Sequence, residues 1–202
     1  MTHCHFRIGG ACAVLSAVTT FFLWLLPSGT LPRLAVNFVH VFLALTAYAA
    51  TAVALWPRRR AGALFGMLWF LLWGFTELLG VSIQIWTVQH WKAGLATAEG
   101  EARRSLEADI AAFAAVWDGM FLLLLCAFLL GTLAFGLAMV RTAGLERVVG
   151  ALMLAAAPLT IVILLQEYAG WSSLGTLVGG VYPVLQPVSR SLLGVWLWRR
   201  NT

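Results

Sequence analysis

Charged residues are scarce in this sequence, and their scarcity excludes a soluble globular protein. Only 10% of the 202 residues are charged, whereas 61% are hydrophobic and the mean hydropathy is +0.90. A soluble domain carries about a quarter charged residues, because they cover its surface in water. That polar coat is missing here, so lipid must be the solvent for most of the exterior. Ten tryptophans agree with this, since indole rings favour the boundary between headgroups and hydrocarbon.

Motifs that would name a reaction or a cofactor are also missing. The three cysteines, Cys4, Cys12 and Cys126, show no paired spacing, which argues against a disulfide framework. There is no HExxH pair, no cluster of histidines, no Gly-x-Ser-x-Gly setting and no glycine-rich phosphate loop. The run His3-Cys4-His5 is expected to be a terminal tail rather than part of a metal site. We therefore predict no metal and no cofactor, leave any catalytic residue unassigned, and favour a protein that is not an enzyme.

The excess of basic residues does not indicate a nucleic-acid partner. The net charge is +5 and the isoelectric point is about 9.7. However, the basic residues stand at the ends of hydrophobic runs rather than on one soluble face. That placement is typical of topology signals and of contacts with anionic lipid headgroups. The partner predicted from composition is the lipid bilayer.

Long apolar runs are what the sequence contains in abundance. A helix needs about 20 apolar residues to cross a hydrocarbon core about 30 Å thick. Six runs meet this requirement: 7–26, 34–56, 61–86, 117–140, 148–167 and 176–198. Pro27 and Pro57 are ordinary helix stops between the first three runs. The predicted fold class is therefore all-α, a polytopic membrane bundle of about six transmembrane helices that forms one domain over residues 1–202.

Basic residues in the short flanks predict the orientation of the bundle. Eight arginines flank the runs on the side shared by the two termini: Arg7, Arg58, Arg59, Arg60, Arg141, Arg147, Arg199 and Arg200. The opposite side holds four basic residues: Arg33, Lys92, Arg103 and Arg104. Because basic flanks stay in the cytoplasm, both termini are expected to face it. The first run could instead be a cleaved signal peptide, but no A-x-A site follows it, so we keep it as a helix.

The third and fourth runs are predicted to continue beyond the membrane as an outer helical hairpin over about 87–116. Its centre mixes acidic and basic side chains, which are expected to form a solvated face. Leu106, Ile110, Phe113 and Trp117 then recur at helical intervals and form one apolar stripe. The alternative to a solvated face is a lid or a docking surface.

Polar side chains within the runs predict a pocket in the outer half of the bundle. Counting about 1.5 Å per residue places His40 and Glu77 roughly 25 Å from the inner surface. A tight turn joins their helices, so the two side chains could touch. Ionisable groups inside a membrane are costly and call for a partner or a purpose. Polar residues near or above this height complete the candidate ligand-binding set: His40, Glu77, Gln84, Asp118, Tyr182 and Gln186.

Arg190 and three prolines mark the last two runs. Arg190 lies roughly 13 Å from the inner face. It is expected either to snorkel toward the headgroups, which the short distance favours, or to bind an anionic ligand. Pro158, Pro183 and Pro187 each free a backbone carbonyl. Free carbonyls at mid-depth are a device of transporters, although proline kinks also occur in membrane helices without that role.

Two segments carry a resemblance to known families. They are Phe6-Arg7-Ile8-Gly9-Gly10, which leads into the first run, and the closing stretch from Arg190 to Trp198. Both resemble the ends of small multi-span bacterial inner-membrane proteins of the domain-of-unknown-function type. The resemblance implies a location in the bacterial inner membrane, and it implies no function and no site residue.

Three hypotheses for function follow from these patterns. The leading one is a binding or transport protein whose polar pocket takes a small molecule or a lipid, with protonation of Glu77 coupled to occupancy or to helix rocking. The second is a membrane enzyme acting on a lipid or isoprenoid with His40 and Glu77 as acid and base. The third is a structural or regulatory subunit that recognises a partner subunit or another copy of itself. Buried hydrogen-bonded packing of His40 and Glu77 is the alternative to any role in chemistry.

Overall fold

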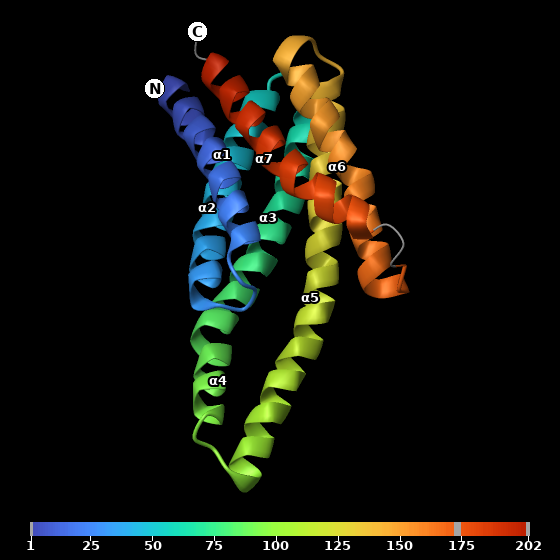
Figure 1. The fold of residues 1–202 in the computed structure, drawn as a ribbon. Helices are drawn as coiled ribbons and strands as arrows, with labels where there is room; N and C mark the ends of the chain where they lie inside the picture. The colour runs from blue at the N-terminus through green and yellow to red at the C-terminus, as the bar shows by residue number, and fades with distance from the viewer. Residues whose placement is uncertain (1, 172–174, 201–202) are drawn as a thin grey trace.

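The chain folds into long helices, as predicted for an all-α bundle. The computed structural model describes residues 2–171 and 175–200, and no strand occurs among them. Six long helices of 24 to 41 residues form the bundle over these residues, and a π-helical turn and a short helix extend the third of them into the hairpin (Figure 1). Their bounds are α1 Thr2–Leu25, α2 Leu31–Leu55, α3 Arg60–Ile83, the π-helix η1 Gln84–Val88, α4 Gln89–Leu95, α5 Gly100–Val140, α6 Gly144–Ala169 and α7 Gly175–Arg199.

Five helical segments are long and apolar enough to span a membrane. They are Cys4–Leu25, Leu31–Leu55, Arg60–Leu95, Gly100–Val140 and Gly144–Ala169. The predicted sixth run, 176–198, does form a helix of this length as α7, but α7 is not among the five. Two prolines, Gln186 and Arg190 lie within it and lower its apolarity.

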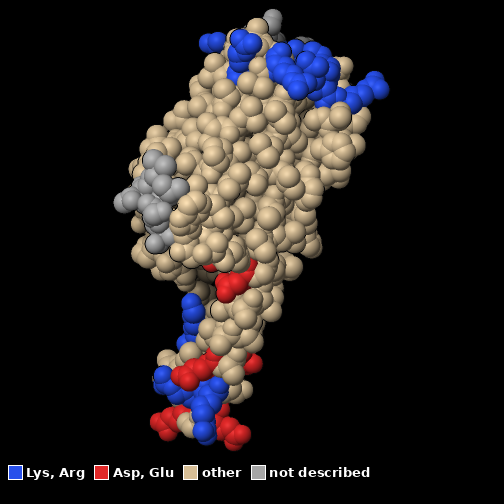
Figure 2. Space-filling model, turned by 90° about the vertical axis from the view of Figure 1, so that its right-hand side faces the viewer, with Lys and Arg blue, Asp and Glu red and all other residues tan. Residues whose placement is uncertain are grey.

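The exterior of the bundle is apolar, as expected for a surface in contact with lipid. Large hydrophobic side chains such as Phe65, Phe75 and Val184 are more than half exposed. Figure 2 shows a broad uncharged surface between two charged ends. Exposed apolar area on this scale is rare on soluble monomers. The chain is thus built as a multi-pass helical membrane protein.

The two charged ends differ in composition. Both termini and the α2–α3 and α5–α6 connections lie at one end, which we call the basic end (Figure 1). Figure 2 shows Lys and Arg gathered there, whereas acidic and basic side chains are mixed at the opposite, hairpin end. The flanking arginines are therefore segregated as the sequence predicts.

The predicted helical hairpin is present at the end opposite the termini. The π-helix η1 carries α3 into α4, and α5 returns after a turn that ends at Gly100, whose φ is +55° (Figure 1). The apolar stripe faces inward across this hairpin. Leu106 packs beside Gly94 of α4, and Trp117 fills the space beside Gly80 of α3. The stripe therefore joins the two arms rather than forming a free apolar face.

Aromatic side chains fill the core between α2, α3 and α5. Tyr48 stacks on Phe70 with 3.7 Å between ring centroids, and Trp73 meets both of these rings edge-on. Phe128 of α5 meets Phe70 edge-on and Trp73 at a tilted angle. Glycine at position 131 leaves the space that the Phe70 ring occupies. This core lies next to the cavity described below, so it fixes the positions of the helices that line it.

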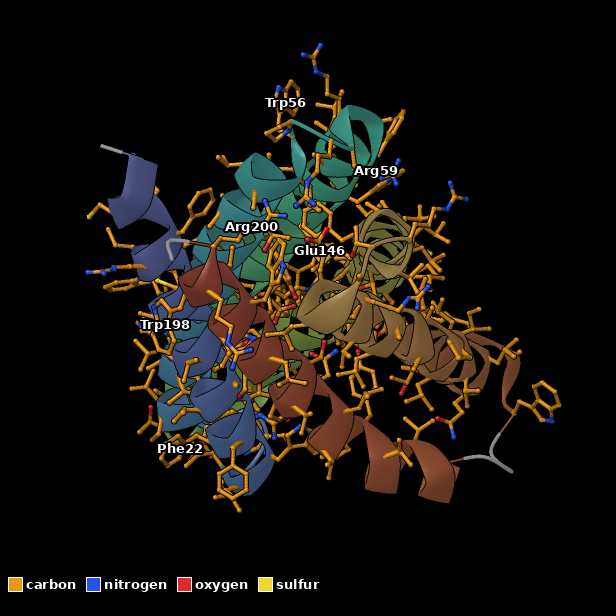
Figure 3. The ribbon with its side chains drawn as sticks, turned by 90° about the horizontal axis from the view of Figure 1, so that it is seen from above. Phe22, Trp56, Arg59, Glu146, Trp198 and Arg200 are labelled. Carbon is orange, nitrogen blue, oxygen red and sulfur yellow. The ribbon has the colours of Figure 1, made fainter. Side chains whose placement is uncertain are left out.

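Close backbone approach joins the first and last helices. A Cβ at Gly10 would lie 2.9 Å from the carbonyl oxygen of Gly194, and a Cβ at Gly194 would lie 2.7 Å from that of Gly10. Nearby, the Trp198 indole N–H donates to the carbonyl of Arg7 at 3.0 Å. Small residues permit such contacts between membrane helices. Figures 1 and 3 both show α1 and α7 side by side.

A buried carboxylate ties the helices together at the basic end. Glu146, in the first turn of α6, accepts hydrogen bonds on Oε2 from Arg58, Arg200 and Trp196. Arg200 also lies over the Trp196 ring, 4.5 Å from its centroid, and donates to the carbonyl of Ala54. We call Glu146, Arg58, Arg200 and Trp196 the basic-end cluster. Figure 3 shows Glu146 and Arg200 near the middle of this end.

Candidate binding cavity

A cavity of about 530 Å³ lies in the half of the bundle nearer the hairpin. All six long helices contribute to its wall. Its polar and ionisable lining consists of Thr20, Arg33, Asn37, His40, Glu77, Gln166, Glu167, Tyr182, Gln186 and Arg190. Its volume is in the range of sites that bind small molecules in proteins.

Three helices converge on His40 at the buried side of this cavity. His40 of α2 is 5% exposed and Arg190 of α7 is 7% exposed. Arg190 Nη1 lies 2.7 Å from His40 Nε2 and 2.7 Å from the Thr20 hydroxyl of α1. The other ring nitrogen, His40 Nδ1, lies 2.8 Å from the Thr19 hydroxyl. Arg190 therefore does not snorkel toward the basic end, and its guanidinium is turned into the bundle.

The contacts of His40 assign its tautomer. A guanidinium only donates hydrogen bonds, so Nε2 of His40 must accept one and the imidazole must be neutral. The ring proton then resides on Nδ1, which donates to Thr19 Oγ1. The Thr19 hydroxyl in turn donates a hydrogen bond to the carbonyl of Leu15 or Ser16. Both nitrogens of His40 are engaged, and neither is free to exchange a proton with a substrate.

Glu77 has a different partner from the one that the sequence suggested. Its Oε1 accepts a hydrogen bond from the Asn37 amide at 2.5 Å, and no hydrogen bond joins it to His40. Oε2 has no hydrogen-bond partner among the described residues, yet it is not enclosed by protein. Because Glu77 borders the cavity, this oxygen faces accessible space. One carboxylate oxygen is thus held in place while the other is open.

Tyr182 and Gln186 are brought together by one turn of α7. The Gln186 amide donates to the Tyr182 hydroxyl at 2.6 Å. Both side chains border the cavity together with His40 and Glu77, so four of the six predicted pocket residues share one space. Helix α7 continues through Pro183 and Pro187, although each lacks a backbone donor.

The other two predicted pocket residues lie elsewhere. Gln84 begins the π-helix η1 and is half-buried outside the cavity lining. Asp118 of α5 is exposed, and its backbone carbonyl accepts a hydrogen bond from Tyr168 at 2.6 Å. Counting rise along a helix gives the height of a residue but not the side of the helix on which it stands. The sequence therefore predicts the height of Gln84 and Asp118 in the bundle but not the direction in which their side chains face.

Several lining residues were not singled out from the sequence. Asn37 and Arg33 precede His40 by three and seven positions, so the three share one face of α2. That spacing could have predicted that Asn37, the hydrogen-bond partner of Glu77, faces the cavity together with His40. Trp73 precedes Glu77 by four positions and so shares its face of α3, whereas Phe121 of α5 carries no such pattern, because apolar residues follow it in the sequence.

Comparisons with known proteins identify no relative. No family model, no curated protein and no solved structure matches the chain. Within residues 2–171 and 175–200 there is no group of three or more His, Cys, Asp and Glu side chains placed to hold a metal ion.

Proposed function

We propose that this chain is a binding or transport protein whose ligand occupies the cavity in the outer half of the bundle. The carrying observation is the Glu77 carboxylate, with one oxygen held by Asn37 and the other open to the cavity. A carboxyl group placed in this way can change its protonation as a ligand enters. Protonation of Glu77 is coupled to occupancy, or to rocking of the helices around the site.

The same proposal places the protein in a bacterial inner membrane with both termini in the cytoplasm. The arginine-rich basic end supports this orientation, because basic flanks are retained on the cytoplasmic side. The hairpin and the cavity then lie toward the outer face.

Accessibility of single cysteines measures the orientation directly. In a background without Cys4, Cys12 and Cys126, we introduce Glu101→Cys at the hairpin or Arg59→Cys at the basic end. A membrane-impermeant maleimide added to spheroplasts is expected to label Glu101→Cys at once and Arg59→Cys only after the membrane is permeabilised. The reverse pattern would overturn the orientation.

Native mass spectrometry of protein released gently from its own membrane tests the function. The wild type is expected to carry a defined small-molecule or lipid adduct. Glu77→Gln should lose the adduct, or lose the pH dependence of its binding, because an amide cannot take up a proton. Glu101→Gln is the matched control, since Glu101 is exposed on the hairpin and should leave the adduct unchanged.

Two other results would replace the proposal. If Glu77→Gln keeps the same adduct with the same pH dependence, coupling through Glu77 is wrong. If the wild type carries only a stoichiometric partner subunit, the polar cluster is architectural and the protein is a structural or regulatory subunit. The acid–base hypothesis for His40 and Glu77 gains no support, because both nitrogens of His40 are engaged and the two side chains do not bond to each other.

A further inference from the structure

We infer that the ligand of this cavity is an amphipathic anion, a molecule with one carboxylate or phosphate group and an aromatic or aliphatic body. The inference rests on the proposed function and names the ligand class for the same site. Two features carry it: a buried guanidinium with open donors and an apolar wall beside it.

Arg190 is a buried cation that forms no ion pair with any described residue. Its two partners, Thr20 and His40, are neutral acceptors, and both contact the same nitrogen, Nη1. An arginine side chain does not lose its proton in a protein, so its charge persists. A charge buried in a membrane bundle requires a counter-charge or water. The cavity it borders is the place where an anion can supply that counter-charge.

The remaining donors of Arg190 are arranged for an acid group. Nε and Nη2 form no hydrogen bond with a described residue, and neither is enclosed by protein. These two nitrogens lie side by side on one edge of the guanidinium plane. Parallel donors on one edge match the two oxygens of a carboxylate or phosphate. Because Thr20 and His40 hold Nη1, the plane is fixed before the ligand arrives, which lowers the entropic cost of binding.

The rest of the lining fits an apolar body rather than a small inorganic ion. Trp73 and Phe128 continue the aromatic core into the cavity, and Phe121, Leu124 and Ile163 extend this wall from α5 and α6. A space of about 530 Å³ far exceeds the needs of phosphate or chloride. Apolar walls with a few placed polar groups are typical of sites for organic ligands.

A matched set of three compounds tests the ligand class. We choose 4-phenylbutyrate, its neutral amide 4-phenylbutanamide and the cation 4-phenylbutylamine, which share one body and differ in the polar end. Binding to the wild-type protein in lipid nanodiscs is measured by isothermal titration calorimetry. The carboxylate is expected to bind at least about tenfold more tightly than the amide, and the amine should bind weakest. Equal binding of all three, preference for the amine, or no binding of the carboxylate would overturn the inference.

Variants of Arg190 connect this preference to the guanidinium. Arg190→Gln is expected to weaken carboxylate binding roughly 30-fold or more while leaving the amide almost unchanged. Arg190→Lys keeps the charge without the fork and should retain part of the preference. Arg104→Gln, exposed on the hairpin, is the control and should bind as the wild type does. An unchanged preference in a folded Arg190→Gln protein would also overturn the inference.

The outcomes separate this inference from the proposed function. If the amine or the amide binds best and Glu77→Gln abolishes its binding, the cavity is a binding site and only the ligand class is wrong. If the native adduct is unaffected by Glu77→Gln, the coupling proposed for Glu77 fails even where the carboxylate preference holds.

Discussion

Gly194→Ala is expected to lower the free energy of unfolding by about 1–3 kcal/mol, whereas Gly119→Ala is expected to leave it unchanged or raise it. The new Cβ at position 194 would stand 2.7 Å from the carbonyl oxygen of Gly10 and 2.8 Å from Val14 Cγ2. A backbone carbonyl cannot rotate away as a side chain can, so α1 and α7 must separate. The effect should therefore lie near the upper end of the range for overpacked sites.

Gly119→Ala is the matched control for Gly194→Ala. Gly119 is also a glycine within a long helix, and a Cβ there meets nothing within 4 Å. Alanine favours a helix over glycine by about 1 kcal/mol, which gives the control the opposite sign. Thermal unfolding of the purified proteins, followed by circular dichroism in one detergent, measures both changes. A Gly194→Ala protein that unfolds at or above the temperature of Gly119→Ala would contradict the close packing of α1 and α7.

The same substitution has a consequence for the cavity. Arg190 precedes Gly194 by one helical turn, and its guanidinium bonds to Thr20 of α1. Moving α7 away from α1 lengthens that bond and releases the guanidinium plane. Gly194→Ala protein that remains folded should therefore bind the carboxylate probe less tightly than wild type, although position 194 does not border the cavity.

The helices could be predicted because the membrane imposes a length. A run of apolar residues must be helical to satisfy its backbone in lipid, so the run 34–56 anticipates α2 at Leu31–Leu55 closely. The charged stretch after residue 99 has no such constraint, yet its helical apolar stripe was enough to predict the hairpin. The π-helix at Gln84–Val88 is not predicted from the sequence, because no local residue pattern indicates i to i+5 backbone hydrogen bonds.

The candidate site could be predicted in height but not in rotation. His40 and Glu77 were placed at one level, and both border the cavity. Asp118 was placed above them and points elsewhere, because packing against the neighbouring helices decides which face of α5 turns inward. The orientation of Arg190 depends in the same way on acceptors from two other helices, α1 and α2. Thr20 lies 170 residues away in the sequence, and nothing local links the two.

Glu146→Leu is expected to lower the free energy of unfolding by about 2–3 kcal/mol, through loss of the basic-end cluster. Breaking a fully buried ion pair costs about 3–5 kcal/mol, because the remaining charge loses its partner. The Glu146 side chain is only 8% exposed, but its partners Arg200 and Arg58 are 20% and 55% exposed. Water therefore screens part of the charge that is left behind, and the loss should fall below the fully buried value.

The exposed fractions of the two arginines also predict which single substitution destabilises the protein more. Arg200→Gln removes the shorter ion pair at 2.8 Å, the contact with the Trp196 ring and a hydrogen bond to Ala54, so it should destabilise almost as much as Glu146→Leu. Arg58→Gln removes a 3.2 Å pair from an exposed side chain and should cost about 1 kcal/mol or less. Unfolding temperatures of the three variants, measured at low and high salt, give the order, and only the Arg58 contribution should fade with salt.

Glu146→Gln tests how much of the stabilisation comes from the negative charge of Glu146 rather than from its size and its hydrogen-bond acceptor. Oε2 accepts all three hydrogen bonds, while Oε1 is buried and has no partner among the described residues. An amide can place its oxygen at Oε2 and its nitrogen at the position of Oε1, which keeps the acceptor, removes the charge and buries two N–H donors. The stability of Glu146→Gln should therefore lie between those of wild type and Glu146→Leu. If Glu146→Gln and Glu146→Leu both unfold at the wild-type temperature, the cluster does not hold α2, α6 and α7 together at the basic end.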